Sequence, residues 1–365
     1  MKILTILGTR PEIIRLSRII PKLDKYSDHV IVHTGQNYDY ELDKIFFNSL
    51  RIRKPNYYLG ARGTFAKQIA TIFEKLEGIL IKEKPDRFLV LGDTNSGLGG
   101  VVAKRLMIPV FHMEAGNRCY DVNVPEEVNR RIIDHSSSIL LPYSNRSCEN
   151  LISEGIPRNR IYVIGNPIYE VIKGSQKKIN SSKILKKLKL KKSSYFLLTL
   201  HRQENVDDSK QLLKFIKLLN VIIKKYSNKN IIWPIHPRTM NLLDSLKINL
   251  NKKITLSKPL NFFDFVKLEN NSFCVLTDSG TVQEECSILK VPCIVLRNST
   301  ERQETVESGA VLMNYDKETS ICKNIQIAVE NKKKDDSIPS EYLLQNVSNR
   351  VINIILGHHN FQFNG

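Results

Sequence analysis

The stretch FHMEAGNRCYDVNVPEEVNRRIID, residues 111–134, decides how the first half of the chain is read. It opens with an apolar run typical of a buried parallel strand, and Glu114 stands where that strand ends. The shorter LVLGDTNS at residues 89–96 has the same form and places Asp93 at the end of its strand. Because open parallel sheets collect ligands at the carboxyl ends of their strands, we expect both acids at one functional edge.

A third acid lies on a helix predicted from the sequence VPEEVNRR. Pro125 suits the first turn of that helix, and Glu126 lies four residues before Arg130, so these two side chains share a face. Three carboxylates and a guanidinium would then face one cleft. Such crowded acids are suited to removing a proton from carbon and returning it elsewhere, because crowding and burial push their pKa values apart.

Plainer explanations exist for some of these residues. Glu126 and Arg130 could form an ordinary solvated pair on a helix. Asp93 could merely cap the helix that follows it. Glu114 has no such explanation, since no capping or turn rule requires an acid at its place in the chain.

Length and composition predict two ordinary globular domains. The chain has 365 residues, of which 41% are hydrophobic and 25% charged. No apolar run reaches the length of a membrane span, and residues 1–7 form a strand pattern without a basic-then-apolar leader. We therefore expect a cytoplasmic protein without membrane contact. Six cysteines without CxxC spacing indicate reduced, buried thiols.

The formal net charge of +18 raises the question of a nucleic-acid partner. The lysines occur in scattered runs, such as residues 186–192 and 332–334, without interleaved aromatic residues or a binding motif. A solvated surface is therefore the preferred interpretation, and no nucleic-acid partner is expected. The excess charge could still steer an anionic substrate toward the protein.

Apolar strands alternate with helices along both halves of the chain. In the first half we predict strands at residues 2–7, 29–34, 86–91, 109–113, 138–142 and 160–164, with helices at 13–23, 65–83, 95–106, 145–154 and from residue 125. In the second half we predict strands at residues 195–200, 231–235, 273–277 and 291–296, with a helix at 209–225. These units specify an α/β fold of two Rossmann-like domains facing a cleft, each a parallel sheet with helices on both faces.

A change of composition marks the domain boundary. Residues 173–194 are rich in Lys, Ser and Asn and are interpreted as the linker. We predict a first domain at residues 1–174, which carries the acids, and a second domain at 175–345. Residues 346–365 are expected to form a C-terminal helix or tail that packs back on the first domain.

Two strand-to-helix turns resemble phosphate-binding turns. At residues 8–12, GTRPE, Arg10 would present a fork of donors beside a helix start. At DSGT, Ser279, Gly280 and Thr281 offer backbone N–H groups and hydroxyls at a helix N-terminus. The G-x-G-x-x-G fingerprint is absent, so a dinucleotide cofactor is not indicated.

The helix after DSGT also carries acids. Glu284 and Glu285, one turn deeper, could accept hydrogen bonds from ribose hydroxyls. The alternative is that DSGT is only an N-cap sequence with no ligand.

An ordered set of motifs along nearly the whole chain resembles the non-hydrolysing UDP-N-acetylglucosamine 2-epimerases, a family with the two-domain GT-B fold. Each motif alone is weak, but the ordered set is specific. The motifs are GTRPE at residues 8–12, TGQ at 34–36, GDTNS at 92–96, HMEAGNR at 112–118, PEEVNRR at 125–131, HRQEN at 201–205, TDSGTVQEE at 277–285 and RNSTERQE at 297–304.

The resemblance implies a role for each matching residue. Its implied catalytic residues are the three acids, a guanidinium and an imidazole: Asp93, Glu114, Glu126, Arg130 and His201. Its implied substrate contacts are Arg10, Ser279 and Gly280 at the diphosphate, Phe265 on uracil, Glu285 at the ribose, and further Arg15, Gln36, His236, Thr281 and Arg302.

The reaction implied by the resemblance inverts C2 of a UDP-2-acetamido sugar. The C2 proton leaves, UDP is expelled by anti elimination, and UDP adds back with protonation on the opposite face. The resemblance implies no metal or cofactor, a homodimer, and a place in bacterial surface polysaccharide synthesis. A hydrolysing epimerase and a GT-B glycosyltransferase are the alternatives.

Several stretches depart from the pattern of the UDP-N-acetylglucosamine enzymes. IIRLS, HTGQNYDYEL and IHPRT look more like the branch acting on 6-deoxy sugars, which makes UDP-N-acetyl-L-fucosamine from its L-talo epimer. Asn37 stands where the UDP-N-acetylglucosamine enzymes have the His of TGQH, so activation by substrate is not expected.

Overall fold

A computed structural model describes residues 1–36, 40–200, 202, 205, 208–313, 318–331 and 338–358. The chain divides into two compact units. The first unit comprises Met1–Lys173 with Ser340–Gly365, and the second comprises Gly174–Pro339.

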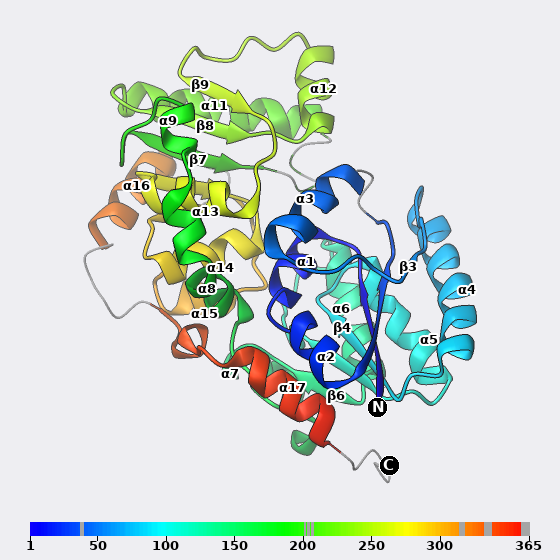
Figure 1. The fold of residues 1–365 in the computed structure, drawn as a ribbon. Helices are drawn as coiled ribbons and strands as arrows, with labels where there is room; N and C mark the ends of the chain where they lie inside the picture. Colours follow the sequence, from blue (N-terminus) through cyan, green and yellow to red (C-terminus); the bar gives the residue numbers. More distant parts are fainter. Residues whose placement is uncertain are drawn as a thin grey trace. The chain divides into compact units, whose positions relative to one another are not determined.

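The first unit is built on a six-stranded sheet in which every neighbouring pair is parallel (Figure 1). The strand order is β3-β2-β1-β4-β5-β6, so the order in which strands are added reverses between the parallel neighbours β1 and β4. The strands are nearly continuous apolar runs because helices cover both faces. They are β1 (Lys2–Leu7), β2 (Asp28–His33), β3 (Tyr57–Tyr58), β4 (Arg87–Leu91), β5 (Val110–Met113) and β6 (Ile139–Leu141).

Amphipathic helices cover this sheet. In α4, Ile72, Leu76 and Leu80 recur every four residues and join Leu4 and Phe88 of the sheet in one apolar cluster. The helical elements of the first unit are α1 (Arg10–Leu16), α2 (Ile20–Tyr26), α3 (Tyr40–Leu50), α4 (Phe65–Glu83), η1 (Asn95–Leu98), α5 (Gly99–Arg105), α6 (Pro125–Ser136), α7 (Asn145–Ser153), η2 (Arg158–Arg160), η3 (Ser340–Leu343) and α17 (Val347–Gly357).

The second unit repeats the topology. Its sheet has the order β12-β11-β10-β7-β8-β9, again with all pairs parallel, and the chain reverses between β7 and β10. The predicted α/β fold with two parallel sheets is confirmed. The strands are β7 (Tyr195–Thr199), β8 (Asn230–Pro234), β9 (Ile254–Ser257), β10 (Cys274–Thr277), β11 (Cys293–Val295) and β12 (Leu312–Met313). The helices are α9 (Ile184–Lys187), α11 (Ser209–Lys225), α12 (Pro237–Ser245), α13 (Phe262–Asn271), α14 (Gly280–Leu289), α15 (Gln303–Glu307) and α16 (Glu318–Asn331).

Two sequence-based predictions are wrong. Residues 173–194 are not an open linker, because α8 (Pro167–Ser181) runs across the unit boundary and α9 follows, with Ile179 and Ile184 buried. The lysines of this stretch lie mostly on exposed positions. Residues 160–164 do not form a strand: after the turn η2 they make one bridge to β6, and Gly165 then turns the chain with φ +89°.

Helix α17 brings the end of the described chain back to the first unit, where it lies beside α2 (Figure 1). Lys22 Nζ donates to Ser348 Oγ at 2.5 Å, and Ser348 N donates to Glu170 Oε2 at 2.9 Å. The second unit ends at Pro339 rather than at residue 345, because Tyr342 and the apolar face of α17 are buried in the first unit. Among the helices that the structure describes, none combines the length and apolar composition needed to cross a membrane.

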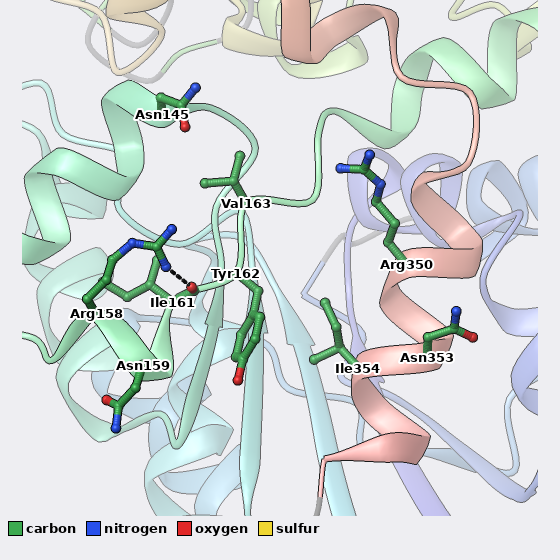
Figure 2. Close-up of a pocket in the computed structure, with 9 residues that line it drawn as sticks. All are labelled: Asn145, Arg158, Asn159, Ile161, Tyr162, Val163, Arg350, Asn353 and Ile354. Atoms are coloured by element: carbon green, nitrogen blue, oxygen red, sulfur yellow. Dashed lines mark hydrogen bonds between the residues drawn. The ribbon is translucent and has the colours of Figure 1, made fainter.

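A groove of about 910 Å³ separates α17 from the segment around η2 (Figure 2). Arg158 and Arg350 reach it from opposite walls, and Tyr162 lies between them. No acid occurs among the nine lining residues, so the groove cannot supply the acid–base chemistry predicted above. The other lining residues are Asn145, Asn159, Ile161, Val163, Asn353 and Ile354.

The buried face of α17 should contribute strongly to the stability of the first unit. Ile355 is 1% exposed, so Ile355→Ala should lower the free energy of unfolding by about 2–5 kcal/mol. Asn353→Ala, on the exposed face of the same helix, is the matched control and should change it by less than about 0.5 kcal/mol. Urea denaturation measures both. Equal effects of the two substitutions would contradict the packing of α17 described here.

Candidate active site

Two acids follow neighbouring strands of the first sheet, at the carboxyl ends of the strands. Leu91 at the end of β4 pairs with Met113 at the end of β5, and Gly92 N donates to Met113 O at 3.0 Å. Asp93 follows Gly92 just after β4, and Glu114 directly follows β5. The parallel register therefore brings both carboxylates to the edge that binds ligands in doubly wound sheets.

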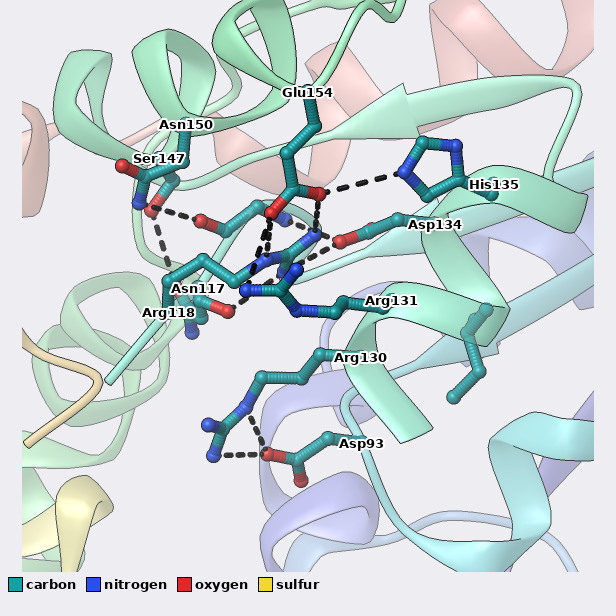
Figure 3. A network of polar contacts seen from close by, with 12 residues as sticks. Asp93, Asn117, Arg118, Arg130, Arg131, Asp134, His135, Ser147, Asn150 and Glu154 are labelled. Atoms are coloured by element: carbon teal, nitrogen blue, oxygen red, sulfur yellow. Dashed lines mark hydrogen bonds and ion pairs between the residues drawn. The ribbon is translucent and has the colours of Figure 1, made fainter. Parts of the chain in front are cut away.

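Arg130 of α6 contacts Asp93 (Figure 3) and connects it to a second acid, Glu127. Its Nε and Nη2 lie 2.8 and 2.7 Å from Asp93 Oδ2, and its Nη1 lies 2.7 Å from Glu127 Oε2. The guanidinium is 2% exposed, whereas the Asp93 side chain keeps 24% of its surface open. Asp93 is thus held in place and can still be reached by a ligand.

Glu127, which the sequence did not single out, is a buried acid in the first turn of this helix. Burial alone would raise its pKa, but hydrogen bonding from Cys119 N and the charge of Arg130 outweigh burial, and the pKa of Glu127 lies below its ordinary value. Its spacing of three residues before Arg130 was the available signal. Glu126 is half-buried in the first turn of α6, where the helix dipole favours an acid.

Glu114 has an unusual backbone conformation. Its φ is +68°, in the left-handed region that costs a residue with a side chain on the order of 1 kcal/mol or more. Its Oε2 lies 3.7 Å from Nε of Arg15, which is 1% exposed, and Asn117 Nδ2 lies 3.4 Å from its Oε1. The structure thus places Arg15, a predicted substrate contact, against a predicted catalytic acid.

Glu12 is a further buried acid that sequence reasoning missed. Its Oε2 accepts hydrogen bonds from Gly8 N at 2.5 Å and Thr9 N at 2.9 Å, and its Oε1 accepts from Thr94 Oγ1 at 2.5 Å. Burial raises its pKa to about 7, although these hydrogen bonds oppose the shift. Glu12 therefore ties the turn after β1 to the turn that carries Asp93. The sequence TRPE, a capping box, was the signal.

Two predicted contacts lie in the same unit. Arg10 is half-buried, with its guanidinium carbon 5.9 Å from the Phe46 ring centroid. Ser96 Oγ lies 3.4 Å from Gln36 Oε1. Asn37 lies outside the described residues.

The end of β10 in the second unit has the form of an anion site. Ser279 occupies the N-cap position of α14, and its Oγ lies 3.0 Å from Thr281 Oγ1. Buried Asp278 accepts hydrogen bonds from Arg202 N at 3.0 Å and Asn205 Nδ2 at 2.9 Å. A Cβ on Gly280 would lie 2.3 Å from Glu301 Oε1, so a larger residue there would require the Glu301 side chain to move.

The other predicted contacts of the second unit have different surroundings. Arg302 is buried and its Nε donates to Glu284, so Glu284 has a protein partner. Glu285 is buried on the same helix, Phe265 packs half-buried against an apolar cluster, and His236 is exposed after β8. His201 lies outside the described residues.

Comparison with known proteins identifies the family. The chain matches the family model described as UDP-N-acetylglucosamine 2-epimerase over residues 22–356. A UDP-N-acetylglucosamine 2-epimerase of Methanocaldococcus jannaschii is 44% identical over 346 residues, which cover 91% of this chain and 93% of the relative. A UDP-2,3-diacetamido-2,3-dideoxy-D-glucuronate 2-epimerase of Pseudomonas aeruginosa is 35% identical, with 85% and 87% covered.

Solved structures agree. The crystal structure of the Methanocaldococcus jannaschii enzyme in complex with UDP-GlcNAc and UDP has a TM-score of 0.91 and 41% identity, and the alignment covers 98% of this chain and 100% of that one. The chain therefore belongs to the UDP-N-acetylglucosamine 2-epimerase family. Its members are isomerases, and the GT-B type of fold implied by the resemblance is confirmed.

The raised pKa of Glu12 predicts a pH-dependent stability. The folded protein holds a proton on Glu12 that the unfolded chain releases near pH 4.5, so the free energy of unfolding should fall as pH rises from 4.5 to about 7. This loss is on the order of 3 kcal/mol. Glu12→Gln should lack it, because an amide does not ionise in this pH range. Its oxygen can still accept from the two N–H groups, and the Thr94 hydroxyl can accept from its N–H, so the variant should fold.

Urea denaturation of both proteins between pH 4.5 and 8 measures the difference. Acids with lowered pKa, such as Glu127, are present in both proteins and cancel. A constant difference across this range would show that folding does not raise the pKa of Glu12.

Proposed function

We propose that the protein inverts C2 of a UDP-2-acetamido sugar, with UDP-N-acetylglucosamine as the first candidate substrate. The observation that supports this most directly is the pair of acids at neighbouring strand ends, Asp93 beside Arg130 and Glu114 beside Arg15. Relatives that are 44% and 41% identical bear the name UDP-N-acetylglucosamine 2-epimerase.

The chemistry requires a base, an acid and cations. The C2–H bond breaks, its electron pair forms the C1–C2 double bond, and the C1–O bond to UDP breaks with the electrons leaving on the diphosphate. UDP then adds back at C1 while C2 takes a proton on the opposite face. We assign the proton transfers to Asp93, Glu114 and Glu126, with Arg130 and His201 as their partners.

The nucleotide contacts are assigned to the second unit, with Arg10 as a further diphosphate contact. Ser279, Gly280 and Thr281 at the N-terminus of α14 bind the diphosphate, because backbone N–H groups and the helix dipole favour negative charge there. Glu285 accepts from the ribose and Phe265 packs on uracil. Further substrate contacts are proposed for Arg15, Gln36, His236 and Arg302.

The sugar beyond C2 distinguishes three candidate substrates. The relatives favour UDP-N-acetylglucosamine or a UDP-2,3-diacetamido-glucuronate, while the stretches IIRLS, HTGQNYDYEL and IHPRT favour the 6-deoxy L-talo substrate of the L-fucosamine branch. All three carry UDP and a 2-acetamido group, so the chemistry at C2 is the same. We further propose a cytoplasmic homodimer that supplies surface polysaccharide synthesis.

Solvent deuterium should appear at C2 of the product. The protein is incubated in D2O with each of the three UDP sugars, and products are examined by NMR and mass spectrometry. We expect one deuterium at C2 of the 2-epimer, most rapidly with UDP-N-acetylglucosamine. Unlabelled epimer would contradict the mechanism, free sugar plus UDP would indicate a hydrolysing epimerase, and an acceptor-dependent product without label would indicate a glycosyltransferase.

Neutralising each acid should slow turnover without weakening nucleotide binding. Asp93→Asn, Glu114→Gln and Glu126→Gln should each lower kcat by about 10²–10⁴-fold, the usual contribution of acid–base catalysis. UDP affinity by calorimetry should stay close to that of the unaltered protein. Glu149→Gln, at an acid whose side chain is 68% exposed on α7, is the control. A variant with normal turnover would remove its residue from the catalytic set.

A further inference from the structure

One face of α6 is directed at the segment that carries Glu114. Glu127, Arg130 and Asp134 follow a spacing of three and then four residues and are all buried. Glu127 accepts hydrogen bonds from Cys119 N at 3.1 Å and Tyr120 N at 3.2 Å. Asp134, at the other end of this face, accepts from Gly116 N at 3.1 Å. The helix therefore holds the segment after β5 at two points.

The Gly116 residue is fixed on both sides of its backbone. Its N–H donates to Asp134, and its carbonyl accepts from Asn150 Nδ2 at 2.9 Å. Its φ is +79°, and a Cβ there would lie 2.2 Å from Ser147 O. The backbone two residues after Glu114 thus has little freedom, which stabilises the left-handed conformation of Glu114.

Asp134 also reaches the turn that carries Asp93. Its Oδ1 lies 2.8 Å from His112 Nδ1, and His112 Nε2 lies 3.0 Å from Gly92 O, the carbonyl next to Asp93. Asp134 is completely buried, so it touches no substrate. The Asp134 carboxylate is therefore linked to both turns that carry the acids, directly at Gly116 and through His112 at Gly92.

A buried guanidinium compensates the charge of Asp134 (Figure 3). Arg118 Nη1 lies 2.8 Å from Asp134 Oδ2, and Arg118 also makes two hydrogen bonds, of 2.8 and 2.6 Å, to Glu154. Burial opposes the ionisation of Asp134, but the hydrogen bond from His112 and the charge of Arg118 outweigh it, so the pKa of Asp134 lies below its ordinary value. The carboxylate can then accept from all its partners at once.

We propose that Asp134 is a positioning residue that sets the relative placement of the catalytic carboxylates of Asp93 and Glu114. It acts through Gly116 on one turn and through His112 on the other. This inference rests on the proposed function and adds to it a residue outside the substrate's reach. Proton transfer at carbon depends on such placement, because a displacement of about 1 Å can cost about 10²-fold in rate.

The test compares two acids that share Arg118. Asp134→Leu removes the contacts of the Asp134 carboxylate with Gly116 N, His112 and Arg118. Glu154→Leu also takes a carboxylate from Arg118, but the described side-chain contacts of Glu154 are with Arg118, Arg131 and His135, so the hydrogen bonds of Gly116 and His112 stay in place. A purely structural role of the network predicts the same result for the two variants, namely fewer folded molecules with normal turnover in each.

We expect Asp134→Leu to lower kcat per folded molecule by about 10²-fold, with KM and UDP affinity within a few-fold, and Glu154→Leu to keep normal kcat. Deuterium incorporation at C2 should fall with kcat. Asp134→Asn should restore most of the rate, since its oxygen can accept from Gly116 and Arg118 while its amide faces His112 Nδ1. Normal kcat in Asp134→Leu, or an Asn variant as slow as the Leu variant, overturns the proposal.

Asn150→Ala provides the second measurement if Asp134→Leu does not fold. It frees the Gly116 carbonyl from the other side, so kcat should fall by about 10-fold at unchanged UDP affinity, in the range that misplacement of a catalytic group produces. Unchanged kcat in this variant overturns the proposal. Absence of C2 exchange in the unaltered protein would instead refute the proposed function, so the two failures are distinguishable.

Discussion

The buried guanidinium of Arg130 is the constraint on which the first unit's site depends. A cation that is 2% exposed must be compensated by nearby anions, because an unpaired buried charge is strongly destabilising. Its partners are Asp93, after β4, and Glu127, in the same helix. The position of α6 is therefore tied to the end of β4, and every other group on its buried face is placed as a consequence.

The sheet and helix α6 each determine part of the geometry of the site. The parallel register puts the ends of β1, β4 and β5 at one edge, which brings the turns together without fixing their conformations. Buried acids then fix those conformations: Glu12 holds the turn after β1, and Asp134 holds the segment after β5. These backbone-binding acids are buried, whereas Asp93 keeps 24% of its side-chain surface exposed.

The sequence predicted the elements whose apolar period is long and regular. The helices at 65–83 and 209–225 have the predicted bounds, and the strands before Asp93 and Glu114 lie within a residue of theirs. The stretch 173–194 was misread because its lysines concealed a buried Ile face, and two-residue strands such as β3 and β12 leave no periodic signal. Asp134 was missed because its partners are a distant backbone N–H group and buried side chains, which no local pattern shows. For Glu12 and Glu127 local signals do exist, namely the capping box and the spacing of three residues before Arg130.

The return of α17 to the first unit makes that unit discontinuous in the chain, and this affects how it can be made. During synthesis, all of residues 174–339 must leave the ribosome before α17 emerges. At about 5–20 residues per second, the N-terminal part waits on the order of 10 s with the apolar surface that Val347, Val351 and Ile355 will cover still open. The first unit therefore stays incomplete throughout the translation of the second unit.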